Sequence, residues 1–177
     1  MGAQAGIPQT PSSPPDGMIQ DRQGSIQVVE FVLGDEQFAI DLFDVREVVE
    51  YTTITKIPNV PSYVRGIIDL RGEITTIVDL KNRLNIPGNN QHSEESDRII
   101  VLDDKTTRSK SGILVDDVTS VSTFEANQVD YTSASISQED TAIIGIIKRK
   151  VKVQEKEKNE LIIWIDIKAI LADIAGK

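Results

Sequence analysis

Paired aspartates are the residues of this chain whose types and spacing could support catalysis. They occur as Asp41 with Asp44, as Asp103-Asp104 and as Asp116-Asp117. General acid–base catalysis needs two carboxyl groups in one pocket whose surroundings push their pKa values apart. Each pair instead falls at a predicted turn or strand end, where aspartate is common because it hydrogen-bonds the local backbone. We therefore expect that the protein is not an enzyme. A carboxylate-based enzyme is the alternative.

Other side chains with reactive or metal-binding potential are scarce. The 177 residues include no cysteine, and the single histidine, His92, lies in a polar stretch, residues 89–93, typical of a solvated loop. Disulfides, thiolate nucleophiles and cysteine-ligated metals are thereby excluded. No glycine-rich phosphate loop or serine nucleophile motif is present. We expect no cofactor and no metal site.

The charge and hydropathy of the chain limit its partners and its location. A net charge of −9 argues against nucleic acid, whose phosphates need a basic surface, and against docking on anionic lipid. No run of 18 or more apolar residues could span a bilayer. Residues 1–6 lack the pattern of a signal peptide. We expect a cytoplasmic protein with no direct membrane insertion.

Short segments rich in Ile, Val and Leu predict a mainly β protein. Residues 1–25 hold four of the seven prolines and predict a flexible tail. The strands predicted in the first half are 26–33, 38–40, 54–57, 64–70 and 73–80, followed by a helical turn at 81–84. Apolar residues at positions 42, 45, 48 and 49 predict a short helix over 41–49, capped by Asp41.

The second half predicts a similar series of elements. The predicted strands are 98–102, 111–115, 118–124, 142–147 and 161–165. Apolar residues at 167, 170, 171 and 174 predict a C-terminal helix that Asp166 caps. Residues 148–160 alternate in charge and predict a solvated hairpin tip.

Three blocks of the first half recur in the same order in the second. Gly66-Ile67-Ile68 matches Gly145-Ile146-Ile147, and Ile77-Val78-Asp79-Leu80-Lys81 matches Trp164-Ile165-Asp166-Ile167-Lys168. Ile40 with Asp44-Val45 and Val48 matches Ile113 with Asp117-Val118 and Val121. Short strands expose edges unless their sheet closes. We therefore predict two packed five-stranded β-barrels, residues 26–96 and 97–177, with short helices, a C-terminal helix and a binding groove between the barrels.

The combined motifs resemble the CheW family of chemotaxis adaptors. They lie in residues 38–48, in Gly66-Ile67-Ile68-Asp69-Leu70-Arg71-Gly72, and in residues 77–80, 112–118 and 161–171, within a resemblance that covers residues 26–174. The resemblance implies two interlocked barrels and a scaffold that links methyl-accepting chemoreceptors to the histidine kinase CheA. The implied partners are the cytoplasmic receptor tip and the regulatory domain of CheA, in arrays at the inner membrane. A CheW-like adaptor of a pathway unrelated to motility is the alternative.

The resemblance also implies two sets of contact residues. The receptor groove maps onto Val29, Leu42, Val45, Val48, Arg71 and Val118. The kinase-facing stretch maps onto Ile54, Lys56 and Ile57. Plain core packing of the valines and a simple surface charge at Arg71 remain the alternatives. The chain departs from the family at Asp69, where Asn is frequent, at Thr76, where Pro is frequent, and in its long charged segment 148–160.

Overall fold

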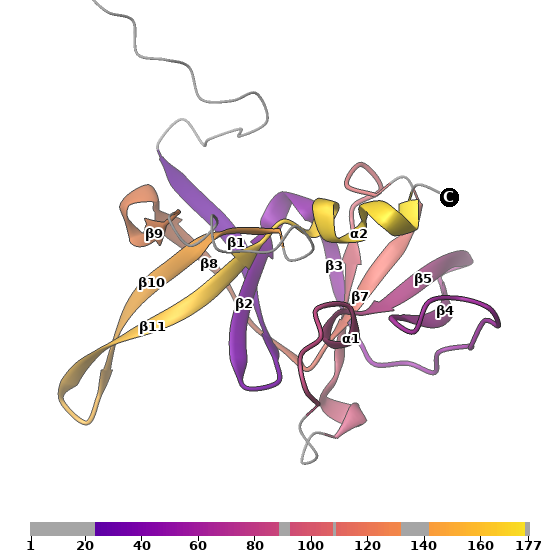
Figure 1. The fold of residues 1–177 in the computed structure, drawn as a ribbon, viewed down its shortest axis with the longest axis horizontal. Coiled ribbons are helices and arrows are strands. Elements are labelled where there is room, and N and C mark those ends of the chain that lie inside the picture. Colours follow the sequence, from indigo (N-terminus) through magenta and orange to yellow (C-terminus); the bar gives the residue numbers. More distant parts are fainter. Residues whose placement is uncertain (1–23, 89–92, 108, 132–141, 176–177) are drawn as a thin grey trace, which may run out of the picture.

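The computed structural model describes residues 24–88, 93–107, 109–131 and 142–175 (Figure 1). The tail expected over residues 1–25 lies outside these ranges except for Gly24 and Ser25, and so does His92. The described chain is mainly β, as predicted. Its strands form one six-stranded sheet and one five-stranded sheet.

The six-stranded sheet has the order β8-β1-β2-β11-β10-β9. Its strands are β1 (Ser25–Leu33), β2 (Glu36–Asp41), β8 (Asp117–Glu125), β9 (Val129–Asp130), β10 (Ile143–Val153) and β11 (Lys156–Ile165). All neighbours are antiparallel except β2 and β11, which run parallel.

The five-stranded sheet has the order β3-β6-β7-β5-β4. Its strands are β3 (Val45–Glu50), β4 (Val64–Leu70), β5 (Glu73–Asp79), β6 (Arg98–Leu102) and β7 (Ser111–Val115). Only β5 and β7 are parallel. The helices are η1 (Leu42–Asp44), α1 (Leu80–Arg83), η2 (Glu94–Ser96), η3 (Ala126–Gln128) and α2 (Ile167–Ala175).

Each sheet takes strands from both halves of the chain. Strands β1 and β2 join the later strands β8 to β11, whereas β6 and β7 join the earlier strands β3 to β5. The boundary expected between residues 96 and 97 therefore does not separate the two sheets. The chain crosses from one sheet to the other between β2 and β3 and returns between β7 and β8.

The repeat blocks of the sequence occupy equivalent places in the two sheets. Gly66 lies in β4 and Gly145 in β10, and each sits at a β-bulge, where the register with the neighbouring strand shifts. Asp79 accepts a hydrogen bond from Asn82 N (3.2 Å) at the start of α1, and Asp166 accepts one from Lys168 N (3.1 Å) at the start of α2. Both aspartates are helix caps, as their position at strand ends predicts.

The helix predicted over residues 41–49 is wrong. Only Leu42–Asp44 is helical, as a 3-10 turn that Asp41 caps, and Val45–Glu50 is strand β3. A bulge between Val45 and Glu47 shifts the strand's alternation by one residue. Val45 and Val48 consequently share one face of the sheet although they are three residues apart, which imitates a helical spacing.

The strand predicted over residues 54–57 is reduced to a single bridge. Thr55 N donates to Ile67 O (2.9 Å), and Ile67 N donates to Thr55 O (2.8 Å). The chain leaving edge strand β3 thus reaches the opposite edge strand β4. Likewise β9, which follows β8, pairs with β10. Each sheet is rolled so that its two edges approach, but the described pairings do not close a continuous barrel.

Three apolar clusters hold this arrangement together. The central cluster lies between the sheets and includes Val29, Phe31 and Ile40 from one sheet and Ile100 and Ile113 from the other. Helix α2 adds Ile167, Ile170 and Leu171 to it. The other two clusters lie one within each sheet, around Val28 and Trp164 and around Ile77 and Ile99. The two sheets therefore share apolar surface through the central cluster.

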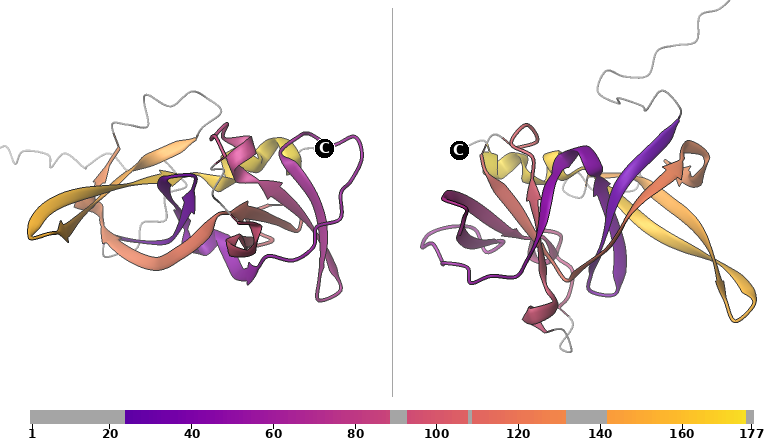
Figure 2. Two further views of the ribbon diagram at one scale, coloured as in Figure 1. Left: turned by 90° about the horizontal axis from the view of Figure 1, so that it is seen from below. Right: turned by 180° about the vertical axis from the view of Figure 1, so that it is seen from behind.

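The charged segment 148–160 is a long hairpin whose strands continue β10 and β11 almost to its tip. Val153 pairs with Lys156, and the turn residues Gln154 and Glu155 have φ values of 51° and 62°. This hairpin extends away from the rest of the sheet, as the views of Figure 2 show.

We predict that Gly66→Ala destabilises the fold. A Cβ atom at this position would lie 2.0 Å from Thr55 O, and the φ of 144° is rarely adopted by other residues. The clash and the backbone strain together are expected to lower the free energy of unfolding by about 2 kcal/mol or more, as measured by urea denaturation. Gly88→Ala, where a Cβ meets nothing within 4 Å, is the control. Equal urea denaturation midpoints for both variants would contradict this role of Gly66.

Candidate functional site

Arg71 occupies a strained position in a two-residue hairpin turn between β4 and β5. Arg71 and Gly72 have φ values of 52° and 86°, the φ pattern of a type I′ turn, in which Asn-Gly is preferred. Asp69 Oδ1 accepts a hydrogen bond from Gly72 N (2.7 Å) and supports the turn. A positive φ costs an arginine about 1 kcal/mol. Gln154 and Glu155 adopt similar φ values in the turn of another hairpin, so any role of Arg71 depends on the contacts of its side chain.

The guanidinium of Arg71 binds Glu47 of β3 through two parallel hydrogen bonds. Nη1 donates to Oε1 (3.0 Å) and Nη2 donates to Oε2 (2.8 Å). Because β3 and β4 are opposite edges of the sheet, this pair joins the two edges. The Arg71 side chain is 70% exposed and that of Glu47 is 21% exposed. An ion pair this open adds at most about 1 kcal/mol to stability, so the guanidinium stays accessible to a partner at little energetic cost.

Further charges line the same sheet beside this turn. Arg46 Nη1 lies 3.5 Å from Glu73 Oε2 and 4.0 Å from Asp104 Oδ1. Lys110 Nζ also contacts Glu73. The hydrogen bond from Lys110, followed by the charges of Lys110 and Arg46, lowers the pKa of Glu73 despite some desolvation. The turn is thus bordered by paired charges of both signs.

The predicted apolar receptor residues divide into a buried set and an exposed one. Val29 belongs to the central cluster and is 1% exposed, while Leu42, Val45 and Val118 are partly buried against that cluster. Val48 shares the face of Val45 but is 41% exposed. Leu42, Val45 and Val118 therefore adjoin the cluster that buries Val29, and Val48 reaches solvent from the same face of β3 as Val45.

Phe43 is an apolar residue of this region that the sequence did not single out. It lies in η1 between Leu42 and Asp44 and is 77% exposed. A large exposed apolar side chain next to the half-buried Leu42 and Val45 extends the apolar surface outward. Position 43 does not belong to the apolar spacing at 42, 45, 48 and 49 from which a helix was predicted, so that pattern did not indicate it.

The predicted kinase-facing residues continue the chain from β3. Ile54 packs against the cluster within the five-stranded sheet, Lys56 is exposed and Ile57 is half-buried. The Thr55 bridge fixes this segment across β4. These residues therefore lie on a different edge from Val48 while belonging to the same rolled sheet.

The described cavity does not coincide with the predicted groove. It has a volume of about 160 Å³ and is lined by Arg65, Asp79, Lys81, Glu94, Asp97, Leu114 and Asp116. None of the predicted receptor or kinase residues lines it. Its mixed charges already engage one another, since Lys81 Nζ lies 2.7 Å from Asp116 Oδ1.

The aspartate pairs are spread over separate structural roles. Asp41 caps η1, and Asp116 accepts a hydrogen bond from Gly34 N (2.7 Å) and pairs with Lys81. Burial raises the pKa of Asp44, although a hydrogen bond from Thr106 and the charge of Lys168 oppose the rise. Within the described ranges, no three acidic or histidine side chains are grouped so that they could hold a metal ion.

A buried ion-pair network around Glu30 was not predicted. Glu30 lies in the interior of β1 at 0% exposure. Its Oε2 accepts hydrogen bonds from Ser120 (2.7 Å), Ser122 and Arg149 Nη1 (3.0 Å). Arg149 Nη2 is 3.0 Å from Glu30 Oε1, an ion-pair contact without hydrogen-bond geometry. Arg149 also binds Glu160 through Nε and Nη2, so the network ties β1 and β8 to the base of the β10–β11 hairpin.

Comparison with known proteins decides the family. The sequence pattern of the CheW-like domain matches residues 27–175. The chain belongs to the CheW-like domain family. A chemotaxis protein CheW of Thermotoga maritima is 30% identical over 159 residues, which cover 90% of this chain and 96% of that protein. A probable chemotaxis protein CheW of Rhizobium etli is 30% identical over 139 residues, 76% of this chain and 87% of that protein.

A solved structure supports the same assignment. The crystal structure of the scaffolding protein TtCheW from Thermoanaerobacter tengcongensis matches with a TM-score of 0.62 at 33% identity. The match covers 79% of this chain and 88% of that one. The mainly β architecture of two packed sheets is therefore the CheW architecture. Among the described helices, none is long and apolar enough to cross a membrane.

The Glu30 network predicts how the stability of this CheW-family protein depends on pH. Burial alone would raise the pKa of Glu30, but hydrogen bonds from Ser122, Ser120 and Arg149 lower it below the ordinary value of 4.5. A carboxyl whose folded-state pKa is lowered adds stability above its unfolded pKa and loses it as the pH falls. We expect the free energy of unfolding to decrease below about pH 4.5, and to decrease less in Glu30→Gln, as measured by urea denaturation across pH 3–7. If the free energy of unfolding of both proteins changed with pH in the same way, this expectation would be contradicted.

Proposed function

We propose that this CheW-family scaffold couples the cytoplasmic tip of methyl-accepting chemoreceptors to the regulatory domain of the histidine kinase CheA. It acts by binding both partners and not by catalysis. Its place is in the cytoplasm, at receptor arrays on the inner membrane. The proposal is supported by the family membership and by Arg71, whose side chain is 70% exposed and oriented by two hydrogen bonds to Glu47.

The receptor contact is proposed at the apolar region around Val48. A receptor tip is a helical coiled coil, and helices bind proteins by placing an apolar face on an apolar surface. Val48 and Phe43 supply exposed apolar area, while Leu42, Val45 and Val118 support it from the central cluster. Val29, at 1% exposure, takes part only by holding this surface in place.

Arg71 is proposed to bind a carboxylate or carbonyl of the same partner from the β4–β5 turn. Two hydrogen bonds to Glu47 fix the orientation of the Arg71 guanidinium. The remaining N–H donors of the guanidinium can then bind a partner. Such a fixed, planar donor loses little conformational entropy on binding. The kinase contact is proposed at Lys56, flanked by Ile54 and Ile57.

We predict that Arg71→Asn separates assembly from stability. Asparagine suits the positive φ of this turn, which offsets the loss of an exposed ion pair. The free energy of unfolding should change by less than about 1 kcal/mol. Capture of a receptor-tip fragment together with the CheA regulatory domain should fall at least about fivefold in a pull-down with purified components. The reason is that loss of a hydrogen bond to a charged group costs about 1.5–3 kcal/mol of binding free energy.

Val48→Asp tests the apolar half of the same site. It should also impair capture without unfolding the protein, because Val48 is 41% exposed. Val153→Asp, at a valine that is 51% exposed near the hairpin tip, is the matched control and should retain capture of both partners. Wild-type capture by both Arg71→Asn and Val48→Asp would refute the proposed site.

A further inference from the structure

We propose that the β10–β11 hairpin is a second docking element, which binds an extended acidic segment of a partner protein as an added strand along β10. The arm is defined here as residues 148–153 of β10 and 156–161 of β11. It lies outside the residues proposed for receptor and kinase binding. The inference therefore does not depend on that function.

Within the part of the chain that the structure describes, the outer backbone edges of the arm have no strand partner. Among the described residues, β10 pairs with β9 only at Ile146 and Ile147, and β11 pairs with β2 only at Ile163 and Trp164. Beyond these positions the two strands pair only with each other, and they extend away from the body (Figure 1, Figure 2). Along residues 148–153 the outer edge of β10 has no backbone pairing with any described residue, and such an edge is the surface to which a further strand adds.

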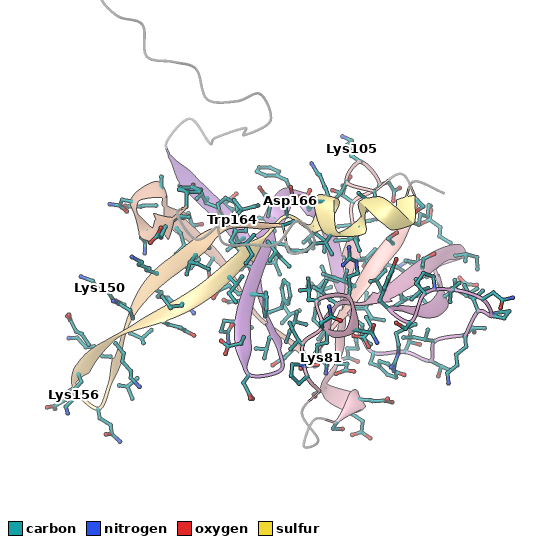
Figure 3. All side chains as sticks on the ribbon, viewed as in Figure 1. Lys81, Lys105, Lys150, Lys156, Trp164 and Asp166 are labelled. Atoms are coloured by element: carbon teal, nitrogen blue, oxygen red, sulfur yellow. The ribbon has the colours of Figure 1, made fainter. Side chains whose placement is uncertain are left out.

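The arm is basic in an acidic protein. Residues 148–160 contain six Lys and Arg and three Glu, a net charge of +3, so the rest of the chain carries −12 to give the total of −9. Lys150 and Lys152 are exposed and form no ion pair with a described residue. Figure 3 shows Lys150 and Lys156 on the projecting part of the hairpin. This separation of charge favours an acidic partner.

The two faces of β10 differ in chemistry. Alternation places Lys148, Lys150 and Lys152 on one face of the strand and Val151 and Val153 on the other. Val153 is 51% exposed. A strand added beside β10 would gain opposite-charge pairs on the first face and apolar pairs on the second if it alternated acidic and aliphatic residues. The arm thus specifies the pattern of its partner as well as its charge.

The base of the arm is held rigidly. Arg149 is bonded to Glu160 on the neighbouring strand and to the buried Glu30 of β1, and its guanidinium lies 5.9 Å from the centre of the Phe124 ring. The positive φ values of Gln154 and Glu155 match the twisted turn of a regular two-residue hairpin. A preformed edge loses less entropy on binding than a flexible loop would.

The test uses the full chain and a fluorescent synthetic peptide of alternating Glu and Val, about ten residues long. Fluorescence anisotropy at low salt should show saturable binding that weakens as salt screens the charges. Two control peptides should bind at least about tenfold more weakly, because neither can form the paired strand. One has the same composition with Glu and Val in two separate blocks, and the other has alternate backbone amides N-methylated.

Two variants with the same change in charge locate the contact. Lys150→Glu with Lys152→Glu alters the free edge strand and should raise the Kd at least about tenfold. Lys156→Glu with Lys158→Glu alters the neighbouring strand, on the opposite face, and should raise it less than about threefold. All four side chains are exposed, so both variants should keep the wild-type thermal midpoint. If a double variant unfolds, Lys150→Gln with Lys152→Gln replaces it.

The proposal is overturned by three results. The first is no saturable binding of the alternating peptide to the wild-type chain. The second is equal weakening by the two double variants, which would reduce the effect to net charge. The third is undiminished binding of the N-methylated peptide, which would exclude an added strand.

Discussion

The apolar cluster between the two sheets exists because the chain exchanges strands between them. The residues that follow β2 enter the five-stranded sheet, and those that follow β7 enter the six-stranded one. The central cluster is therefore built from both sheets and from α2. Each fully buried Val, Ile, Leu or Phe contributes about 1.5–3 kcal/mol, and neither sheet could cover its central face without the other. The position of every surface residue, including those of the proposed contact regions, depends on this cluster.

The proposed binding region is the outer margin of that cluster. Leu42, Val45 and Val118 lean against the core, and Val48 and Phe43 carry the apolar surface outward. Arg71 reaches β3 because the rolled sheet brings β3 and β4 together, through the Thr55 bridge and the Glu47 pair. The weak exposed ion pair and the strained turn contribute little net stability. Under the proposed function, recognition of a partner explains both.

Much of the fold was predictable because its signals are local. The apolar strands, the capping aspartates and the repeated glycine blocks each reflect contacts within a few residues or a repeated pattern. The helix predicted at 41–49 failed because the bulge after Val45 imitates a helical spacing. The Glu30 network was hidden for another reason, since Arg149 lies 119 residues away. The repeat did not indicate it either. Glu30 pairs with Ala39 as Val101 pairs with Gly112 in the other sheet, and Arg149 follows Gly145 by four residues as Leu70 follows Gly66, so apolar residues take both places. The hairpin at residues 148–160 was predicted from its charged sequence, whereas the lack of further strand neighbours among the described residues came only from the structure.

Differential scanning calorimetry of the full chain tests the dependence of both sheets on the shared cluster most directly. If neither sheet is stable alone, the protein unfolds in one transition, and the calorimetric enthalpy equals the van't Hoff enthalpy. Two resolved transitions, or a calorimetric enthalpy well above the van't Hoff value, would mean that the sheets unfold separately. That result would contradict the account.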